Sequence, residues 1–161
     1  PAYFTALGTS SSAATIPVSM ESTLKNGISK PVASFVIPLC ATIHLSGSMI
    51  KLTLYAFAIV YMANLDISTS TGLGFIFLLG IMMIAAPGVP GGAVMVAAGL
   101  LADMMGFDDG MVALMIAAYI AIDSVGTAAN VTGDGAIAMI VDKFAGSKKD
   151  HTEEESAEAT A

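Results

Sequence analysis

In the segment DSVGTAANVTGDGAIAMIVDKF, residues 123–144, two carboxylates, an amide and a hydroxyl recur at helical spacing within a run that is rich in Ala, Gly, Ile, Val and Met. These four side chains stand at i, i+4, i+7 and i+11 and are Asp123, Thr127, Asn130 and Asp134. At 100° per residue they share one face of a helix. Because a charged side chain inside a bilayer costs at least about 2.5–3.5 kcal/mol, such a stripe indicates an ion or polar-ligand path. A structural seam of mutually satisfied polar groups is the alternative.

The composition predicts a membrane-embedded chain. Of the 161 residues, 55% are hydrophobic and only 12% are charged, well to the apolar side of soluble domains. The net charge of −7 says little about partners, because much of it comes from the acidic stretch DHTEEESAEATA, residues 150–161. We expect residues 146–161 to form a disordered acidic tail. No basic patch suggests a nucleic-acid partner, and the single cysteine, Cys40, is expected to be a packed small residue.

The apolar sequence falls into four blocks, and polar or Gly/Pro-rich segments interrupt three of them. The interruptions are GTSSSAATIP (8–17), TIHLSGS (42–48) and APGVPGG (86–92). Non-helical backbone survives at membrane depth only where protein or a water-filled cavity covers it, so the broken segments predict a buried site. The fold class expected is an all-α membrane protein, with two re-entrant helical hairpins and two interrupted transmembrane helices in an inverted-repeat arrangement. The blocks are a hairpin over 1–26, a broken helix over 33–65, a hairpin over 67–107 and a broken helix over 110–143.

The charges predict the orientation of these blocks. The connection at 25–32 and the C-terminus carry all but one of the lysines, namely Lys25, Lys30, Lys143, Lys148 and Lys149. The opposite connections carry Asp66, Asp103, Asp108 and Asp109. By the positive-inside rule the lysine side, with the C-terminus, is cytoplasmic in an integral protein of the plasma membrane. Only Lys51 breaks this segregation.

Three motifs in order resemble those of the dicarboxylate/amino acid:cation symporter family, which includes glutamate, aspartate and neutral amino acid transporters. They are SSSAATIP (10–17), PGVPGG (87–92) and NVTGD (130–134), and the resemblance covers residues 1 to about 145. It implies an elevator-type carrier in which residues 1–145 form the C-terminal part of the moving transport domain. It also implies an N-terminal scaffold half that this sequence lacks, a homotrimer in the full-length form, and contact with membrane lipid. We therefore expect the chain to be the C-terminal part of a longer protein.

The resemblance also implies roles for individual residues. Asp123 matches the aspartate that holds the substrate ammonium, which Thr127 and the Val89 carbonyl help to position. The substrate carboxylate is assigned to Ser11 and Ser12 in the first hairpin motif and to Asn130 in the last helix. Ser48 completes the substrate site. A coupling sodium ion is assigned to Asn130 and Asp134 with the backbone of Cys40 and His44, since hard cations prefer oxygen ligands. No other cofactor is expected.

Two departures from the family pattern bear on substrate and coupling. The sequence HLSGS stands where the family usually has Asn-Met-Asp-Gly-Thr, so that His44 replaces the Asn and Ser46 the Asp, and one anionic cation ligand is missing. Gly126 replaces the arginine that grips an acidic side chain, and the chain has no arginine. We therefore expect a neutral amino acid as substrate and fewer sodium ions than in the multi-sodium members. The alternatives are an acidic substrate held by Lys51, and proton coupling.

Two residues keep two interpretations each. Lys51 is either a snorkelling lysine at a helix edge or a replacement cation in the site. His44 is either a packed polar residue or a proton-coupled group.

Two function classes remain besides amino acid symport. A channel-like module would share the polar stripe but would not need two hairpin gates, and a non-transporting fragment is a further possibility. An enzyme is not expected, because the sequence shows no nucleophile–base pair, no HExxH spacing and no phosphate-binding glycine loop.

Overall fold

The computed structural model describes the backbone of residues 1–158 and the side chains of residues 1–145, and all the regular elements in that range are α-helices. They are α1 (Ala2–Thr9), α2 (Ser12–Lys25), α3 (Lys30–Ile43), α4 (Ser46–Met62), α5 (Thr69–Met83), α6 (Gly92–Met105), α7 (Asp109–Ala121) and α8 (Asp123–Glu158). The all-α class expected from the sequence is confirmed. The disordered tail expected over residues 146–161 falls outside the residues whose side chains are described, and it stays a prediction.

Polar residues in the turns and connections between helices begin three of these helices. The side chains of Ser11, Ser68 and Asp108 each accept a hydrogen bond from the backbone N–H three residues further on, at the start of α2, α5 and α7. Each cap satisfies one of the backbone donors that a helix leaves free at its N-terminus. The helix starts are therefore determined locally, by residues that the sequence itself displays.

Proline and glycine shape the remaining boundaries. Pro31 lies in the first turn of α3, where its fixed φ suits the helix, so α3 begins at Lys30 rather than at residue 33 as expected. Pro17 lies inside α2, and the first interruption is the turn at Ser10, which adopts a left-handed conformation with φ 50°. Gly91 takes φ 73° in the second interruption, a value that favours glycine, and α6 follows it directly.

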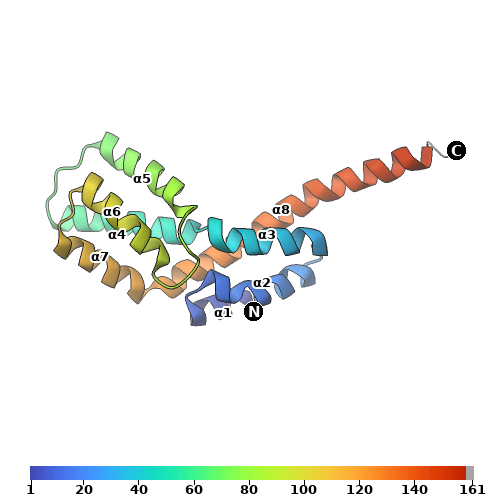
Figure 1. The fold of residues 1–161 in the computed structure, drawn as a ribbon, viewed down its shortest axis with the longest axis horizontal. Helices are drawn as coiled ribbons and strands as arrows, with labels where there is room; N and C mark the ends of the chain where they lie inside the picture. Colours follow the sequence, from blue (N-terminus) through green and yellow to red (C-terminus); the bar gives the residue numbers. More distant parts are fainter. Residues whose placement is uncertain (159–161) are drawn as a thin grey trace.

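The helices pack as two groups that meet at the breaks of the two long segments (Figure 1). Helices α4 to α7 enclose the larger hydrophobic core, which includes Leu52, Phe75 and Leu101. Helices α1, α2 and α3 pack against α8 around two smaller clusters, one at Ile37 and Ala138 and one at Ala6 and Ala128. The breaks between α3 and α4 and between α7 and α8 lie where these groups join, and they position the site.

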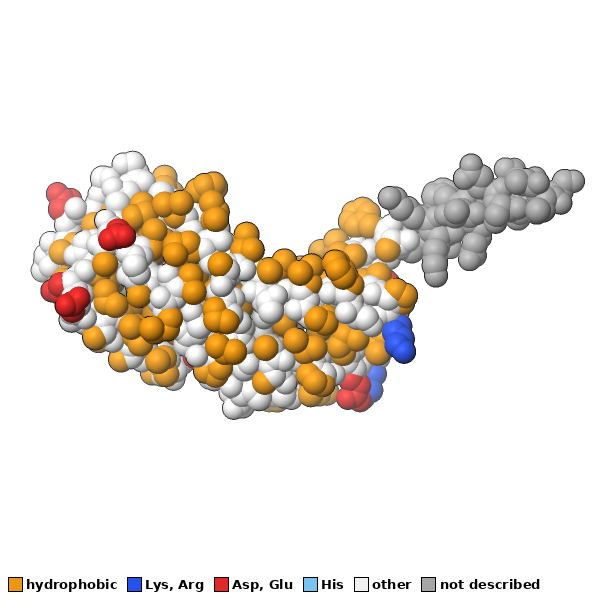
Figure 2. Space-filling model, viewed as in Figure 1, with side chains coloured by type: hydrophobic (Ala, Val, Ile, Leu, Met, Phe, Trp, Pro, Cys, Tyr) orange, Lys and Arg blue, Asp and Glu red, His pale blue; other side chains and the backbone are white. Residues whose placement is uncertain are grey.

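The helix lengths and the surface suit a membrane. By length and composition, the run Lys30–Met62 is long and apolar enough to cross a bilayer, and α7 with α8 qualifies as a second span if this pair, bent by 63°, is counted as one. Apolar side chains cover much of the surface seen in Figure 2. The large apolar residues exposed on the described part of the chain include Phe35, Leu54, Phe77 and Met95. Such extensive exposed apolar area marks a membrane or protein contact surface.

The exposed charges gather at opposite ends of the molecule. The acidic residues of the α4–α5 and α6–α7 connections lie at one end, and the lysines that flank the α2–α3 connection lie at the other (Figures 1 and 2). The same separation of lysines from aspartates predicts the orientation of the chain in the membrane. Lys51, the exception, lies between the two ends and is buried, with 7% of its surface exposed.

Candidate functional site

The turn between α1 and α2, which we call the first tip, touches the loop between α5 and α6, the second tip. The Ser11 hydroxyl donates a hydrogen bond of 2.9 Å to the Gly88 carbonyl, and the backbone N–H of Ala13 donates a second one, of 3.1 Å, to the same oxygen. There is no room at Gly88 for a side chain, because an added Cβ would collide with the carbonyl of Ala41 at the end of α3. The tips therefore close over the break between α3 and α4.

Asn130 of α8 binds the start of α4. Its Oδ1 accepts hydrogen bonds from the backbone N–H of Gly47 (2.8 Å) and of Ser48 (3.3 Å), and its Nδ2 donates to the Ser48 hydroxyl at 3.0 Å. The side chain of Leu45, the residue that precedes α4, supplies no cap, so Asn130 acts as a cap from another helix. Gly47 is needed for this approach, because a Cβ there would lie 2.5 Å from the Gly126 carbonyl.

Asp123, the first residue of α8, is buried and has partners on both oxygens. Oδ1 lies 2.9 Å from the Lys51 ammonium, and Oδ2 accepts a 2.8 Å hydrogen bond from the Gly91 N–H of the second tip. The Lys51 ammonium also lies 3.5 Å from the centroid of the Tyr119 ring, over its face. A buried ion pair thus connects the α4 helix, the α7–α8 break and the second tip. The interpretation of Lys51 as a snorkelling lysine at a helix edge is wrong, because its ammonium lies in the interior and is paired.

Asp134 forms a second pair, further along α8. Its Oδ1 lies 2.8 Å from Nδ1 of His44, the residue at the α3–α4 break, and Asp134 is 1% exposed. His44 packs directly against Gly133, where an added Cβ would collide with the imidazole ring. Among the described residues no three His, Cys, Asp or Glu side chains group as metal ligands. A cation at Asp134 therefore requires amide or backbone oxygens as well, and the end of α3 presents carbonyls that an α-helix leaves free.

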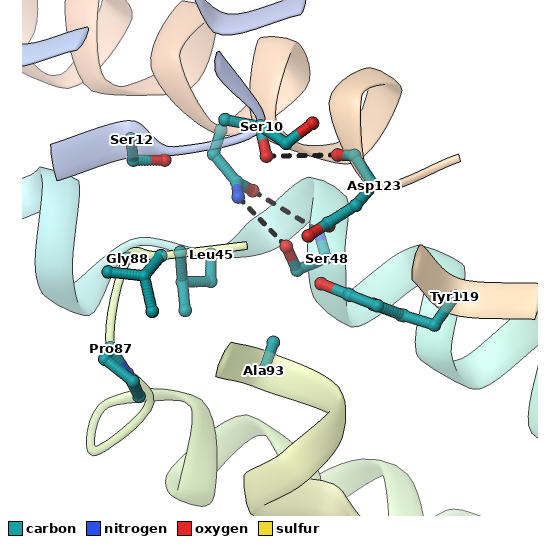
Figure 3. Close-up of a pocket in the computed structure, with 12 residues that line it drawn as sticks. Ser10, Ser12, Leu45, Ser48, Pro87, Gly88, Ala93, Tyr119 and Asp123 are labelled. Atoms are coloured by element: carbon teal, nitrogen blue, oxygen red, sulfur yellow. Dashed lines mark hydrogen bonds between the residues drawn. The ribbon is translucent and has the colours of Figure 1, made fainter. Parts of the chain in front are cut away.

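A small cavity lies between the tips and the helix breaks. Its volume is about 10 Å³, close to the space of a single water molecule. Figure 3 shows the tip residues Ser12, Pro87 and Gly88 on one side of it and Ser48, Tyr119 and Asp123 on the other. A cavity of this size holds no ligand larger than water.

The structure brings most of the predicted substrate residues to this cavity. Those that line it are Ser12, Ser48, Val89, Asp123, Thr127 and Asn130, and Ser11 lies beside it in the contact between the tips. The Thr127 hydroxyl donates to the carbonyl of Asp123, and the Val89 carbonyl accepts from the Gly92 N–H. The four stripe residues are all buried, as the helical spacing predicts.

Of the predicted cation residues, Asn130 lines the cavity, whereas Asp134, His44 and Cys40 lie outside its lining. Asp134 pairs with His44 on the side of α8 that faces the end of α3, and the Cys40 carbonyl accepts the N–H of His44 at 2.8 Å. Cys40 itself is buried and free, as expected of a packed residue.

Two features of the site were not found from the sequence. Tyr119 is 1% exposed and forms one wall of the cavity, but in the sequence it resembles any aromatic residue of an apolar helix. Asp123 as the partner of Lys51 was also missed. The one signal was that Lys51 broke the charge segregation, which marks a lysine that is not at either membrane surface.

Comparisons with known proteins identify the family of this sequence. A model of the sodium:dicarboxylate symporter family matches residues 1–144. Excitatory amino acid transporter 1 of Rattus norvegicus is 32% identical over 142 residues, which cover 88% of this chain and 26% of that protein. Neutral amino acid transporter B(0) of Mus musculus is 31% identical over 137 residues, which cover 81% of this chain and 24% of that protein. The Homo sapiens protein of the same name is 29% identical over 161 residues, which cover 96% of this chain and 28% of that protein. The chain thus spans roughly a quarter of the length of these relatives.

Proposed function

The chain belongs to the sodium:dicarboxylate symporter family, and on that premise we propose that it supplies the substrate- and cation-binding part of a secondary active transporter for amino acids. Relatives named as excitatory and as neutral amino acid transporters support amino acids as the substrate class. The single observation that carries the proposal is the meeting of two interrupted tips and two broken helices around the buried polar face of α8. A carrier needs such a site, closed to water and lined by polar groups.

In this proposal α1–α2 and α5–α6 are re-entrant hairpins, and α3–α4 and α7–α8 are interrupted spans of an inverted repeat. Residues 1–145 are then most of a moving transport domain of the elevator type. The N-terminal scaffold half, outside this sequence, completes the protein and holds it as a homotrimer. The contact between Ser11 and Gly88 represents the closed gate, and substrate enters when this contact breaks.

The proposed substrate is a neutral amino acid. Its carboxylate is bound at Ser11, Ser12 and Asn130, and its ammonium at Asp123. A second carboxylate in a dry cavity costs several kcal/mol unless a fixed cation compensates it. Gly126 stands where the resemblance places an arginine, and the chain has none. Lys51, the alternative partner for an acidic side chain, is already engaged by Asp123.

The proposed coupling ion is sodium, bound at Asp134 with Asn130 and the backbone of Cys40 and His44. Ser46 supplies no charge where the family pattern has an aspartate, so we expect fewer sodium ions than in the acidic amino acid carriers. Proton coupling is the second candidate, and the 2.8 Å contact between His44 and Asp134 favours it, because this imidazole is placed to exchange a proton with a buried carboxylate.

The protein is proposed to lie in the plasma membrane with its C-terminus in the cytoplasm, on the side of Lys25 and Lys30.

The test is uptake by the full-length protein in liposomes. Labelled neutral and acidic amino acids are supplied under separate sodium and proton gradients. We expect saturable uptake of a neutral amino acid that depends on a sodium gradient. Uptake driven by the proton gradient alone would show that the coupling ion is the proton and not sodium. Stronger competition by aspartate or glutamate than by serine, alanine or cystine would refute the neutral substrate. Currents that do not saturate would favour a channel, and the absence of any transport would favour a non-transporting module.

A further inference from the structure

The Lys51 ammonium sits in a complete cage of cation-binding groups. Its Nζ lies 2.9 Å from Asp123 Oδ1, 3.3 Å from the Tyr119 carbonyl and 3.4 Å from the Ile122 carbonyl, and the Tyr119 ring covers it at 3.5 Å. Three acceptors match the three protons of an ammonium group. The cage therefore binds a primary ammonium, and a side chain of the protein already occupies it.

We propose that Lys51 is a tethered cation that holds the place at Asp123 where an amino acid's ammonium would bind, and that it decides which carboxylates the site accepts. The inference rests on the proposed function, because it concerns the same site. A carboxylate without an ammonium group finds Asp123 already neutralised, whereas an amino acid must displace Lys51 before its own ammonium reaches that carboxylate.

Displacement is opposed by the contacts of Asp123 itself. Its second oxygen, Oδ2, accepts the Gly91 N–H at 2.8 Å, so each oxygen already has a partner and the charge of Asp123 is already balanced by Lys51 when a ligand's ammonium arrives. The Gly91 bond also ties the second tip to Asp123. With Lys51 in place the tip closes over a paired carboxylate, and the empty site carries no uncompensated charge.

The surroundings of Lys51 offer its ammonium no second carboxylate outside the cage among the residues that line the adjoining hollow. Gly126 makes room for the side chain, since a Cβ there would lie 3.2 Å from Nζ and 3.3 Å from Cε. The adjoining hollow between α4 and α8 has a volume of about 310 Å³, but apolar side chains line most of it, including Ile50, Leu54 and Val125. Moving an ammonium there would exchange the carboxylate and two carbonyls of the cage for a largely apolar lining in which Tyr55 carries a hydroxyl. The lysine therefore penalises ligands that bring their own ammonium.

The test compares amino acids with the hydroxy acids that have the same side chain. Binding of L-alanine against L-lactate, and of L-leucine against L-2-hydroxyisocaproate, is measured on the purified full-length protein. For the wild type we expect each hydroxy acid to bind within about tenfold of its amino acid. In Lys51→Met, the amino acids should gain about tenfold in affinity and the hydroxy acids should lose about tenfold, because Asp123 is left without its cation.

Two further variants keep the test decisive. Lys30→Met removes a lysine that lies exposed at the start of α3, and it should leave the ratio of the two affinities unchanged. If Lys51→Met does not fold, the charge-balanced double variant Lys51→Met with Asp123→Asn replaces it. Because this variant has neither the cation nor its partner, the hydroxy acids should keep about their wild-type affinity, whereas the amino acids lose the carboxylate that binds their ammonium, and the ratio of the two affinities should change.

The outcomes separate this inference from the proposed function. If amino acids bind the wild type while the hydroxy acids are rejected by more than about a hundredfold, Lys51 does not substitute for an ammonium. If Lys51→Met folds and its ratio of amino acid to hydroxy acid affinity equals that of the wild type, the inference is overturned and the proposed function stands. The same holds for the double variant if only that variant folds. If no carboxylate of either class binds to folded protein, the proposed function fails and the inference fails with it.

Discussion

The Ser11 hydroxyl lies 2.9 Å from the Gly88 carbonyl and donates to it, although the two residues are 77 positions apart in the sequence. The same hydroxyl accepts the Ala14 N–H at 3.1 Å, so that one atom both caps α2 and holds the second tip against the first. The start of α2 and the contact between the two tips are therefore coupled. A change that opens the tips at Ser11 also weakens the first turn of α2.

Ser11→Ala should shift the tips towards an open arrangement. It removes one hydrogen bond to Gly88, of about 1 kcal/mol, and an N-cap of similar value, while the Ala13 N–H still satisfies the Gly88 carbonyl. Spin labels at Ala14 and Ala85 should report longer distances than in the parent protein. Ser22→Ala, which removes a local bond to Val18 within the same helix, is the matched control. Identical distance distributions in Ser11→Ala and Ser22→Ala would show that the contact does not hold the gate.

Asn130→Ala should destabilise the fold itself, in addition to any loss of binding. It strands the N–H groups of Gly47 and Ser48, and each buried unsatisfied group costs about 1–3 kcal/mol. Asn130→Asp keeps the acceptor oxygens at the start of a helix and should cost less. Unfolding of the full-length protein in detergent, followed by heat or denaturant, measures both. An Asp variant as unstable as the Ala variant would contradict the capping role.

Asp134→Asn should raise the sodium concentration that gives half-maximal uptake, by about tenfold or more, because it removes the anionic oxygen proposed as a cation ligand. Asp142→Asn, an exposed site further along α8 that accepts hydrogen bonds from Ser29, is the control and should leave the sodium dependence unaltered.

His44→Gln distinguishes sodium coupling from proton coupling. It should preserve sodium-driven uptake, and loss of proton-driven uptake in this variant would instead favour the His44–Asp134 pair as the coupling site. Unchanged sodium dependence in Asp134→Asn would refute its assignment.

Asp108 and Lys30 should lie on opposite sides of the membrane. Asp108 caps α7 in one exposed connection and Lys30 begins α3 near the other, at the far end of the molecule. In a Cys40→Ala background, cysteine at position 108 should react with an impermeant reagent from outside, and cysteine at position 30 only after the membrane is opened. Labelling of both positions from the same side would rule out the four-block topology.

Much of the fold could be predicted from the sequence because its signals are local. A capping side chain acts on an N–H three residues away, a proline on its own turn, and a left-handed glycine on its own φ. The polar face of α8 is local too, since the helical period alone brings Asp123, Thr127, Asn130 and Asp134 to one side. The apolar composition and the exceptional position of Lys51 were equally visible.

The tertiary structure alone decided which groups face that polar stripe. Lys51 meets Asp123 because α4 and α8 cross at Gly47 and Gly126, where the absence of side chains permits close approach. His44 meets Asp134 because α3 ends beside α8, and Ser11 meets Gly88 because two tips from distant parts of the chain converge. Sequence spacing determines the face on which a charge lies, but the partner of that charge depends on how separate helices cross, and no spacing within one helix encodes that crossing.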